Sequence, residues 1–223
     1  MKLYELASAC YVYAAFTNFD EAYSKFLKNT SPSLDMRNDD HLKALLEWLR
    51  AFGCRQFEKE SDGGDSKTLK DWYEKDEHLL PSPSKTLLSL PKDELDKAGK
   101  IYENLKDKEI SRKTVGATCA SKILFALRKD VFPLWDGEMR KKLRQSNRIT
   151  SYRQYLEYVK QEFLELDEDC KKHDIVLSKV PNELSRPWSS LIKLIDEYHW
   201  VVLTRDRKPL TASELEKWHC WAQ

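Results

Sequence analysis

One stretch of the chain combines a tight turn, a run of basic residues and a carboxylate at the expected start of a helix. Val115 and Gly116 form the turn, and Asp136 stands twenty residues after the glycine, before an amphipathic segment. The first turn of a helix has free backbone N–H groups, so a helix that starts after Gly116 can hold a phosphate. A carboxylate at a helix start can act as a general base or stabilise developing positive charge. The stretch therefore predicts a phosphate site beside a carboxylate.

The positive charge of the chain is concentrated around this stretch. The whole chain has a net charge of +1, whereas residues 112–148 contain ten basic and three acidic residues. One strongly basic face on a nearly neutral protein favours docking on phosphates, with an affinity that falls as the salt concentration rises. A solvated helix surface would also explain a run of charge, but the adjoining turn favours nucleic acid.

Two helices and an extended segment are expected to position these residues. The helix after the turn should bury one face and expose another, with Ala120, Ile123, Leu124 and Leu127 inside and Ser121, Lys122, Phe125 and Lys129 outside. Pro133 disfavours helix at Phe132, so residues 131–134 should be extended. A second helix is then expected to begin near Asp136.

With these residues identified, the stretch resembles the helix-hairpin-helix superfamily of DNA glycosylases, which contains endonuclease III and the 8-oxoguanine glycosylases. In that family a G-V-G-like turn leads into a helix, and an extended V-P-V-D-type segment carries a catalytic aspartate to the next helix. Residues 115–118 resemble the hairpin, and residues 131–136 resemble the segment. The resemblance covers residues from about Leu95 to Leu143, and it implies that Asp136 is catalytic.

Two positions depart from the pattern of the family. Thr114 occupies the place of the first hairpin glycine, although a β-branched residue does not tolerate positive φ. Thr118 falls where bifunctional members carry their Schiff-base lysine, and Lys113 and Lys122 flank it. We therefore expect a monofunctional enzyme without lyase activity, with Lys122 as an alternative nucleophile.

The resemblance also implies a substrate and a set of contacts. The partner is double-stranded DNA, from which a damaged or modified base is extruded and hydrolysed at its N-glycosidic bond, leaving an abasic site. A hypermodified base in phage DNA, attacked in antiphage defence, is one such substrate. No cofactor or metal is implied. Trp135 is a candidate wall of the base pocket. The implied DNA-binding residues are Lys113, Val115, Gly116, Thr118, Lys122, Arg140 and Lys141.

Two other interpretations stay open at this point. In the first, Asp136 is the N-cap of its helix and has no catalytic role. The chain would then be a non-catalytic helix-hairpin-helix protein that binds duplex DNA through phosphate contacts. A helical interaction protein without a nucleic-acid role is the third possibility, and it predicts no salt-dependent DNA binding.

The rest of the chain predicts an all-α fold of two helical lobes with a cleft between them. Apolar residues recur at helical spacing in most segments, Pro187 is expected to start a late helix, and only Trp200–Thr204 has strand propensity. Pro81 and Pro83 forbid a helix across them and indicate a lobe boundary. The predicted units are an N-terminal lobe (1–84), a helix-hairpin-helix lobe with Asp136 (85–149), and C-terminal helices that pack back on the N-terminal lobe (150–223).

Cysteine usage and hydropathy predict a cytoplasmic monomer. The five cysteines are scattered without close pairs, as reduced thiols are, and they predict neither an iron–sulfur cluster nor a zinc site. No apolar run approaches the roughly 20 residues of a membrane helix. The first residues also lack the pattern of a secretory signal. We therefore expect no membrane partner.

Overall fold

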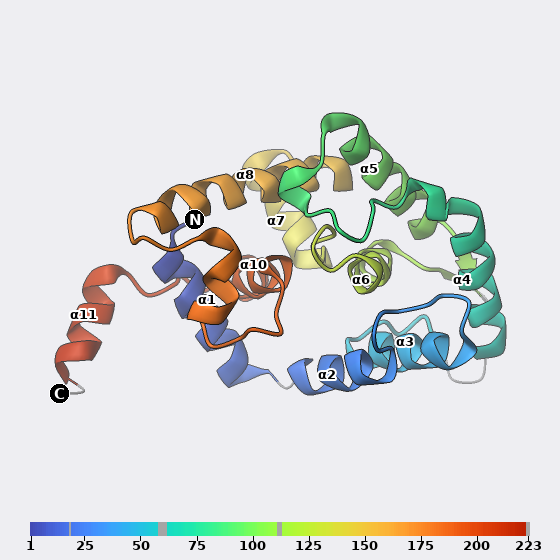
Figure 1. Ribbon diagram of the computed structural model, residues 1–223, viewed down its shortest axis with the longest axis horizontal. Coiled ribbons are helices and arrows are strands. Elements are labelled where there is room, and N and C mark those ends of the chain that lie inside the picture. Colours follow the sequence, from blue (N-terminus) through green and yellow to red (C-terminus); the bar gives the residue numbers. More distant parts are fainter. Residues whose placement is uncertain (18, 58–61, 111–112, 222–223) are drawn as a thin grey trace.

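Helices make up most of the described chain (Figure 1). The computed structural model describes residues 1–17, 19–57, 62–110 and 113–221. The α-helices, in chain order, are α1 (Leu3–Phe16), α2 (Phe19–Asn29), α3 (Asp39–Ala51), α4 (Asp62–Asp76), α5 (Lys92–Lys106), α6 (Ala117–Leu127), α7 (Gly137–Asn147), α8 (Tyr152–Lys171), α9 (Val180–Glu183), α10 (Leu191–His199) and α11 (Ala212–Trp221). The shorter elements are η2 (Glu77–Leu79), η3 (Leu87–Ser89), β1 (Glu109–Ile110), β2 (Lys113–Thr114), η4 (Leu177–Lys179) and η5 (Trp200–Thr204).

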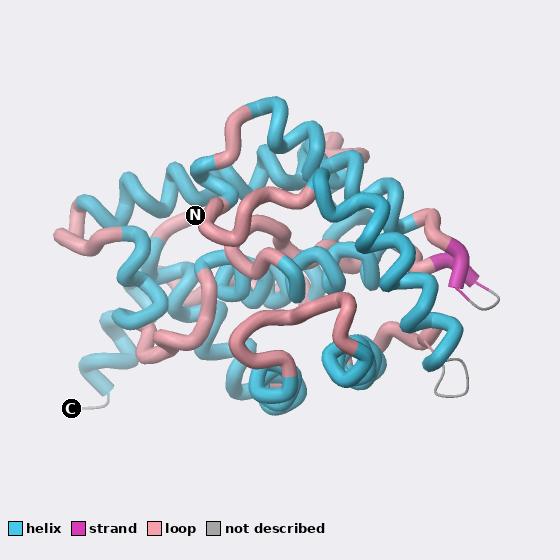
Figure 2. Tube along the Cα trace, turned by 45° about the vertical axis from the view of Figure 1, so that its right-hand side comes forward, coloured by secondary structure: helices cyan, strands magenta, loops and turns pink. Residues whose placement is uncertain are grey.

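The strand content of the described residues is one short antiparallel hairpin, formed by β1 and β2 (Figure 2). Glu109 pairs with Thr114, and Ile110 pairs with Lys113. The hairpin connects α5 to α6. This mostly helical content agrees with the predicted all-α class.

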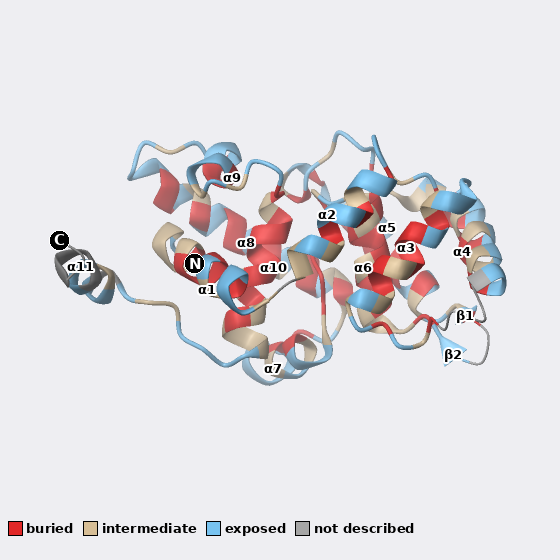
Figure 3. Ribbon diagram, turned by 90° about the horizontal axis from the view of Figure 1, so that it is seen from below, coloured by how far each residue is buried: buried red, intermediate tan, exposed pale blue. Residues whose placement is uncertain are grey.

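The largest buried cluster joins α2, α3 and α4 to α5, α6 and α8 (Figure 3). The cluster contains Trp48 and Trp72, which precede the predicted lobe boundary after residue 84 in the sequence, and Tyr102 and Tyr152, which follow it. Two smaller clusters place α1 against α8, α10 and η5. The first helix therefore packs with the C-terminal helices, while α11 lies apart at the end of the molecule (Figure 1).

Helix α6 is buried on more sides than its sequence pattern predicts. The expected exposure of Ser121 and Phe125 is wrong, because both side chains are buried. Helix α6 packs against both α5 and α3, and the Phe125 ring lies 5.6 Å from that of Tyr23 and 6.5 Å from that of Trp48. An amphipathic pattern assumes one packed face, whereas a helix in the centre of a bundle is covered on several.

The helix expected to start at Pro187 begins at Leu191 instead. The Ser190 side chain accepts a hydrogen bond from the backbone N–H of Lys193 and so caps α10. Trp188, expected on the buried stripe, is exposed. Proline permits a helix start, but here the capping serine determines where the helix begins.

The segment with strand propensity, Trp200–Thr204, forms the π-helical turn η5, which follows α10 directly. Val201 is buried in a cluster with Ala9 and Tyr13 of α1. Strand propensity reflects how well a side chain fits a half-buried surface, so packing against α1 overrides it. Within the described residues, no helix combines the length and apolar character needed to cross a membrane.

Candidate functional site

The extended segment that leads to Asp136 is held in place by α8. The Tyr152 hydroxyl donates to the carbonyl of Pro133 at 2.7 Å, and the Tyr155 hydroxyl donates to the carbonyl of Leu134 at 2.9 Å. Both tyrosines are fully buried, so these bonds are shielded from water. The backbone immediately before Asp136 is therefore fixed by two neighbouring turns of one helix.

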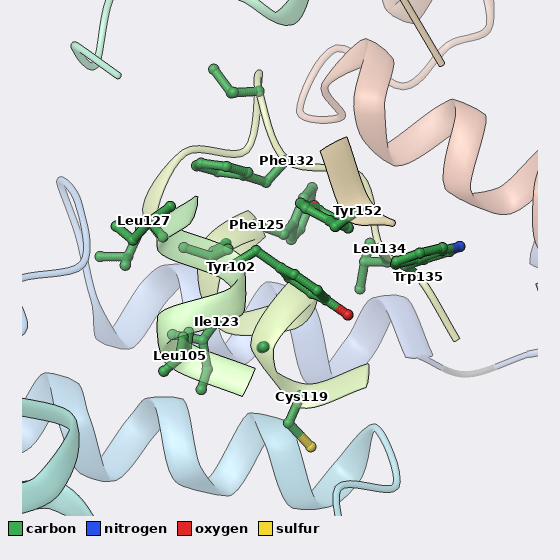
Figure 4. Close-up of a cluster of buried hydrophobic side chains, with 14 of the residues drawn as sticks. Tyr102, Leu105, Cys119, Ile123, Phe125, Leu127, Phe132, Leu134, Trp135 and Tyr152 are labelled. Carbon is green, nitrogen blue, oxygen red and sulfur yellow. The ribbon is translucent and has the colours of Figure 1, made fainter. Parts of the chain in front are cut away.

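Helix α6 fixes the next residue of the segment. The backbone N–H of Trp135 donates to Ser121 Oγ at 3.0 Å, which explains why Ser121 is buried. The indole of Trp135 stacks on Tyr155 with centroids 5.2 Å apart and planes at 9°. Figure 4 shows the indole nitrogen turned away from Tyr102 and Tyr152. Among the described residues, this nitrogen has no hydrogen-bond partner.

Changing Tyr155 to Phe is expected to lower the free energy of unfolding by about 1–3 kcal/mol, because it leaves the buried carbonyl of Leu134 without its donor and removes the contact of the hydroxyl with His199 Nδ1. The measurement is a urea titration followed by circular dichroism. Tyr11→Phe is the matched control, since Tyr11 is 77% exposed and its hydroxyl can bond to water. Equal midpoints for the two variants would show that the Tyr155 hydroxyl does not hold the segment.

Asp136 caps α7 with one oxygen and contacts η5 with the other. Its Oδ1 accepts from the backbone N–H of Met139 at 2.8 Å, and its Oδ2 accepts from Thr204 Oγ1 at 2.8 Å. The N-cap role foreseen for Asp136 is thus confirmed. A second role remains open to it, because a carboxylate has about four acceptor positions and these two bonds occupy only half of them.

Asp136 lines a pocket of about 280 Å³ between two groups of helices. Helices α1 and α10 and the turn η5 contribute to one side, and α6, α7 and the segment before Asp136 contribute to the other. The aromatic side chains in its walls are Tyr13, Phe19, Phe52, Trp135 and Trp200. A cavity near 300 Å³ with aromatic walls and few charged groups is typical of a site for a small planar ligand.

Three charged side chains enter this aromatic pocket, namely Asp136, Asp196 and Lys122. Burial raises the pKa of Asp196 to about 7, Lys193 opposes the shift, and Asp136 adds to it. Burial also lowers the pKa of Lys122, although Asp196 and Asp136 oppose that change. Asp196 can therefore carry a proton near neutral pH, and Lys122 loses its proton more readily than an exposed lysine does.

Lys122, predicted to bind DNA on the surface, lies inside the pocket. Its Nζ donates to the backbone carbonyl of Phe52 at 2.5 Å and lies 5.4 Å from the centre of the Phe52 ring. The ammonium group thus lies at the wall of the pocket that Asp136 also lines. This position suits the alternative nucleophile role better than a phosphate contact.

A buried ion cluster supports the α10 side of the pocket. Lys193 Nζ lies 2.6 Å from Glu197 Oε1 and 3.2 Å from Asp20 Oδ1, and 4.3 Å from the centre of the Tyr13 ring. Arg186 pairs with the same two carboxylates. Two cations and two anions therefore balance, and they connect α10 to α1 and α2.

The predicted hairpin turn adopts a conformation that needs a glycine. Gly116 has φ +74° and precedes α6. Val115, predicted to bind DNA, is fully buried. Thr114 belongs to β2 and is not among the described residues with positive φ, so the missing first glycine causes no strain. The Gln56 side-chain amide donates to the carbonyl of Val115 and so supports the turn.

The expectation that the cysteines are reduced thiols is wrong for two of them. Cys54 and Cys119 form a disulfide across 65 residues, with Cα atoms 6.0 Å apart. The pair connects the loop after α3 to α6. The spacing of the cysteines does not indicate this disulfide, because the two residues meet only when α3 packs against α6. Cys10 and Cys170 are free and buried.

The remaining predicted DNA contacts divide into surface and interior positions. Lys113 and Lys141 are exposed, and Thr118 is half-buried at the start of α6. Arg140 Nη1 donates to the carbonyl of Trp135 at 2.6 Å and to Thr118 Oγ1 at 3.2 Å, so it joins α7 to α6. Arg140 therefore positions the pocket wall instead of extending into solvent.

Two basic residues beside the pocket were missed from the sequence. The guanidinium of Arg205 lies 4.5 Å from the centre of the Trp200 ring, and that of Arg207 lies 5.3 Å from the centre of the Phe16 ring. Both residues are exposed and directly follow η5. The R-D-R-K sequence that contains them was a local signal, but the fold was needed to bring it next to α7.

Asp196 was also missed, although the pattern of α10 contains a sign of it. Ile192, Ile195 and His199 form the buried stripe of this helix, and Asp196 stands four residues after Ile192 on the same stripe. A carboxyl on the buried face of an amphipathic helix is unusual and indicates a functional role.

The fold and the site together define a mostly helical protein with an aromatic pocket that contains two carboxyl groups and a lysine. The described residues include no group of three or more His, Cys, Asp or Glu side chains that could hold a metal ion. Comparison of the chain with protein-family models, curated proteins and solved structures finds no match in any of the three.

Proposed function

We propose that this protein is a monofunctional DNA glycosylase, which hydrolyses the N-glycosidic bond of an extruded base and leaves an abasic site. The observation that carries the proposal is the position of Asp136, fixed as the N-cap of α7 in the wall of an aromatic pocket. Support also comes from Gly116, whose positive φ opens α6 after a hairpin, as the resemblance to the helix-hairpin-helix glycosylases implies. The enzyme is proposed to act as a monomer in the cytoplasm, where the Cys54–Cys119 disulfide would be exceptional.

The chemistry follows from the charge that develops on the sugar. As the base departs, C1′ becomes positively charged, and a carboxylate beside it stabilises that state and accepts a proton from the attacking water. Asp136 is suited to this because Met139 and Thr204 hold both of its oxygens in place. The aromatic walls of the pocket would stack on the extruded base.

DNA is proposed to dock on the face that surrounds the pocket. Backbone N–H groups at the start of α6 and the exposed side chains of Lys113, Lys141, Arg205 and Arg207 would contact phosphates. Arg205 already rests on Trp200, which lines the pocket, and Arg207 rests on Phe16 of α1. Because Trp200 lines the pocket, a phosphate held by Arg205 would place an extruded nucleotide near the cavity.

The docking face predicts a change in salt dependence. Lys141→Gln and Arg207→Gln should each weaken duplex binding and reduce the slope of log K against log salt concentration by about 0.9, because each removes one phosphate contact. Fluorescence anisotropy from low to moderate salt measures this slope. Lys97→Gln, an exposed lysine on α5, is the control and should leave it unchanged. An unchanged slope in all three variants would place the DNA elsewhere.

The experiment that tests the function is incubation of the purified protein with DNAs carrying ordinary, damaged and phage-modified bases. Strand breaks are expected only after alkali or an abasic-site endonuclease is added, and they should disappear with Asp136→Asn. Breaks that form without the second step would instead support attack by Lys122, whose lowered pKa and position in the pocket favour a nucleophilic amine. Bound DNA with no break on any substrate would favour the non-catalytic binding module.

The phage-modified substrates matter because the identity of the base is set by the pocket. Release of a hypermodified base with no release of ordinary damaged bases would support a role in antiphage defence.

A further inference from the structure

Asp196 is a buried carboxyl that no other described residue pairs with. Its residue is 8% exposed, and it lines the same pocket as Asp136. Among the described residues, Asp196 has no hydrogen bond and no ion pair, although Asp136 has two hydrogen bonds. Buried polar groups are nearly always hydrogen-bonded in folded proteins. An unpaired carboxyl in a cavity wall therefore indicates a partner that arrives with the ligand.

The two cationic residues nearest to Asp196 on α10 are already engaged. Lys193 Nζ lies 2.6 Å from Glu197 Oε1. His199 Nε2 lies 2.7 Å from Glu162 Oε2, in a separate buried contact. Neither group donates a hydrogen bond to Asp196, so the carboxyl is available to a molecule in the pocket.

Burial favours the protonated form of Asp196. Burial raises its pKa to about 7, with Asp136 and Glu197 adding to the shift and Lys193 and His199 opposing it. The titratable groups on other elements that interact with Asp196 are Asp136, Lys122 of α6, Tyr13 of α1 and Tyr155 of α8. A protonated carboxyl has one O–H donor, which an ionised carboxylate lacks.

We propose that Asp196 donates a hydrogen bond to the extruded base and delivers its proton to that base as it departs. This inference rests on the glycosylase function proposed above. It divides the work of the two carboxyl groups, with Asp136 acting on the sugar and water and Asp196 acting on the base. The substrate class is then an uncharged base that presents a ring nitrogen or a carbonyl oxygen toward α10.

The step balances in atoms and charge. The bond between C1′ and the base nitrogen breaks, and its electron pair stays on the base. The Asp196 proton moves to an acceptor atom of that base, so the base leaves neutral and Asp196 becomes a carboxylate. Water adds to C1′ and gives its proton to Asp136. Transfer of that proton through solvent to Asp196 restores the starting state.

A base that already carries positive charge provides an internal control. 7-Methylguanine leaves as a neutral molecule without receiving a proton, so its release does not need Asp196. Release of an uncharged base does need it, because its departure would otherwise create an anion. General acid catalysis contributes about a hundredfold or more to such a step.

The test compares wild type with Asp196→Asn in single-turnover release from pH 5 to pH 9. The substrates are an oligonucleotide with the uncharged base that the panel identifies and methylated DNA containing 7-methylguanine. Asn keeps a hydrogen-bond donor of similar shape but cannot release a proton. The rate at which the variant releases the uncharged base should be lower by about a hundredfold or more, with little change in KM. Its rate of release of any cationic base should be close to that of wild type.

The pH profile gives a second readout that needs no variant. With the uncharged base, the wild-type rate should be highest while Asp196 is protonated and should fall as the pH rises above about 7. A rate that does not fall, or an Asp196→Asn variant as fast as wild type at every pH, would overturn the inference while leaving the glycosylase intact. No release by wild type, or full release by Asp136→Asn, would instead overturn the proposed function, and the inference with it.

Discussion

Asp136→Asn is expected to reduce base release by about 10²-fold to 10⁴-fold while leaving the fold and DNA binding unchanged. Asparagine has the shape of aspartate, and its carbonyl oxygen can still accept from the backbone N–H of Met139. Its amide can donate to Thr204 Oγ1 in place of the existing bond. The substitution therefore removes the negative charge with little change in geometry. Single-turnover base release and fluorescence anisotropy measure the two effects separately.

The control for this variant is Glu138→Gln. Glu138 is exposed in the first turn of the same helix, so the change removes an equal charge at a similar distance from the helix start. It should retain base release. Equal losses in the two variants would mean that the charge near α7 acts through the helix dipole or through DNA affinity, and Asp136 would then be no more than a cap.

Lys193→Met is expected to lower the free energy of unfolding by about 3–5 kcal/mol, because it removes one of the two cations that pair with the fully buried Glu197 carboxylate and leaves only Arg186 there. Burial alone would lower the pKa of Lys193, but Glu197, assisted by Tyr13, Asp196 and Asp20, raises it above its ordinary value. The side chain is 2% exposed and contacts Glu197 on the next turn of α10. Methionine fills similar volume, so the loss reports the missing charge rather than a cavity.

Lys171→Met is the matched control for this comparison. Lys171 also pairs with two carboxylates on its own helix, Asp167 and Glu168, but its side chain is 59% exposed. Water and salt screen such pairs, so the unfolding midpoint in urea should hardly change. If both variants lost the same stability, the burial of the Lys193 cluster would not be what makes it strong.

Local signals in the sequence were sufficient to predict the start of α7 and the turn before α6. Pro133, Asp136 and the stripe of α7 lie within a few residues of one another, and Gly116 stands directly before α6, so neighbouring residues determine their conformation. The mostly helical fold followed from the same periodicity. These predictions needed no knowledge of how distant segments pack.

The pocket could not be predicted, because its walls come from segments far apart in the chain. Lys122 seemed to be a surface residue until α6 was found between α3 and α5. Asp196 meets Asp136 only because α10 packs against α1 and its continuation η5 packs against α7. A single sequence records which residues are apolar, but not which helix covers which face.

The π-helical turn η5 makes the site sensitive to the length of the chain between α10 and the segment after it. A π turn contains one residue more than the α-helical turn it replaces. Deletion of one residue from Trp200–Thr204 would restore the α-helical repeat and rotate all that follows by about 100°. Thr204 would then turn away from Asp136, and Arg205 and Arg207 would leave the edge of the pocket. The residue that the π turn adds therefore keeps Thr204 in contact with Asp136 and Arg205 in contact with Trp200.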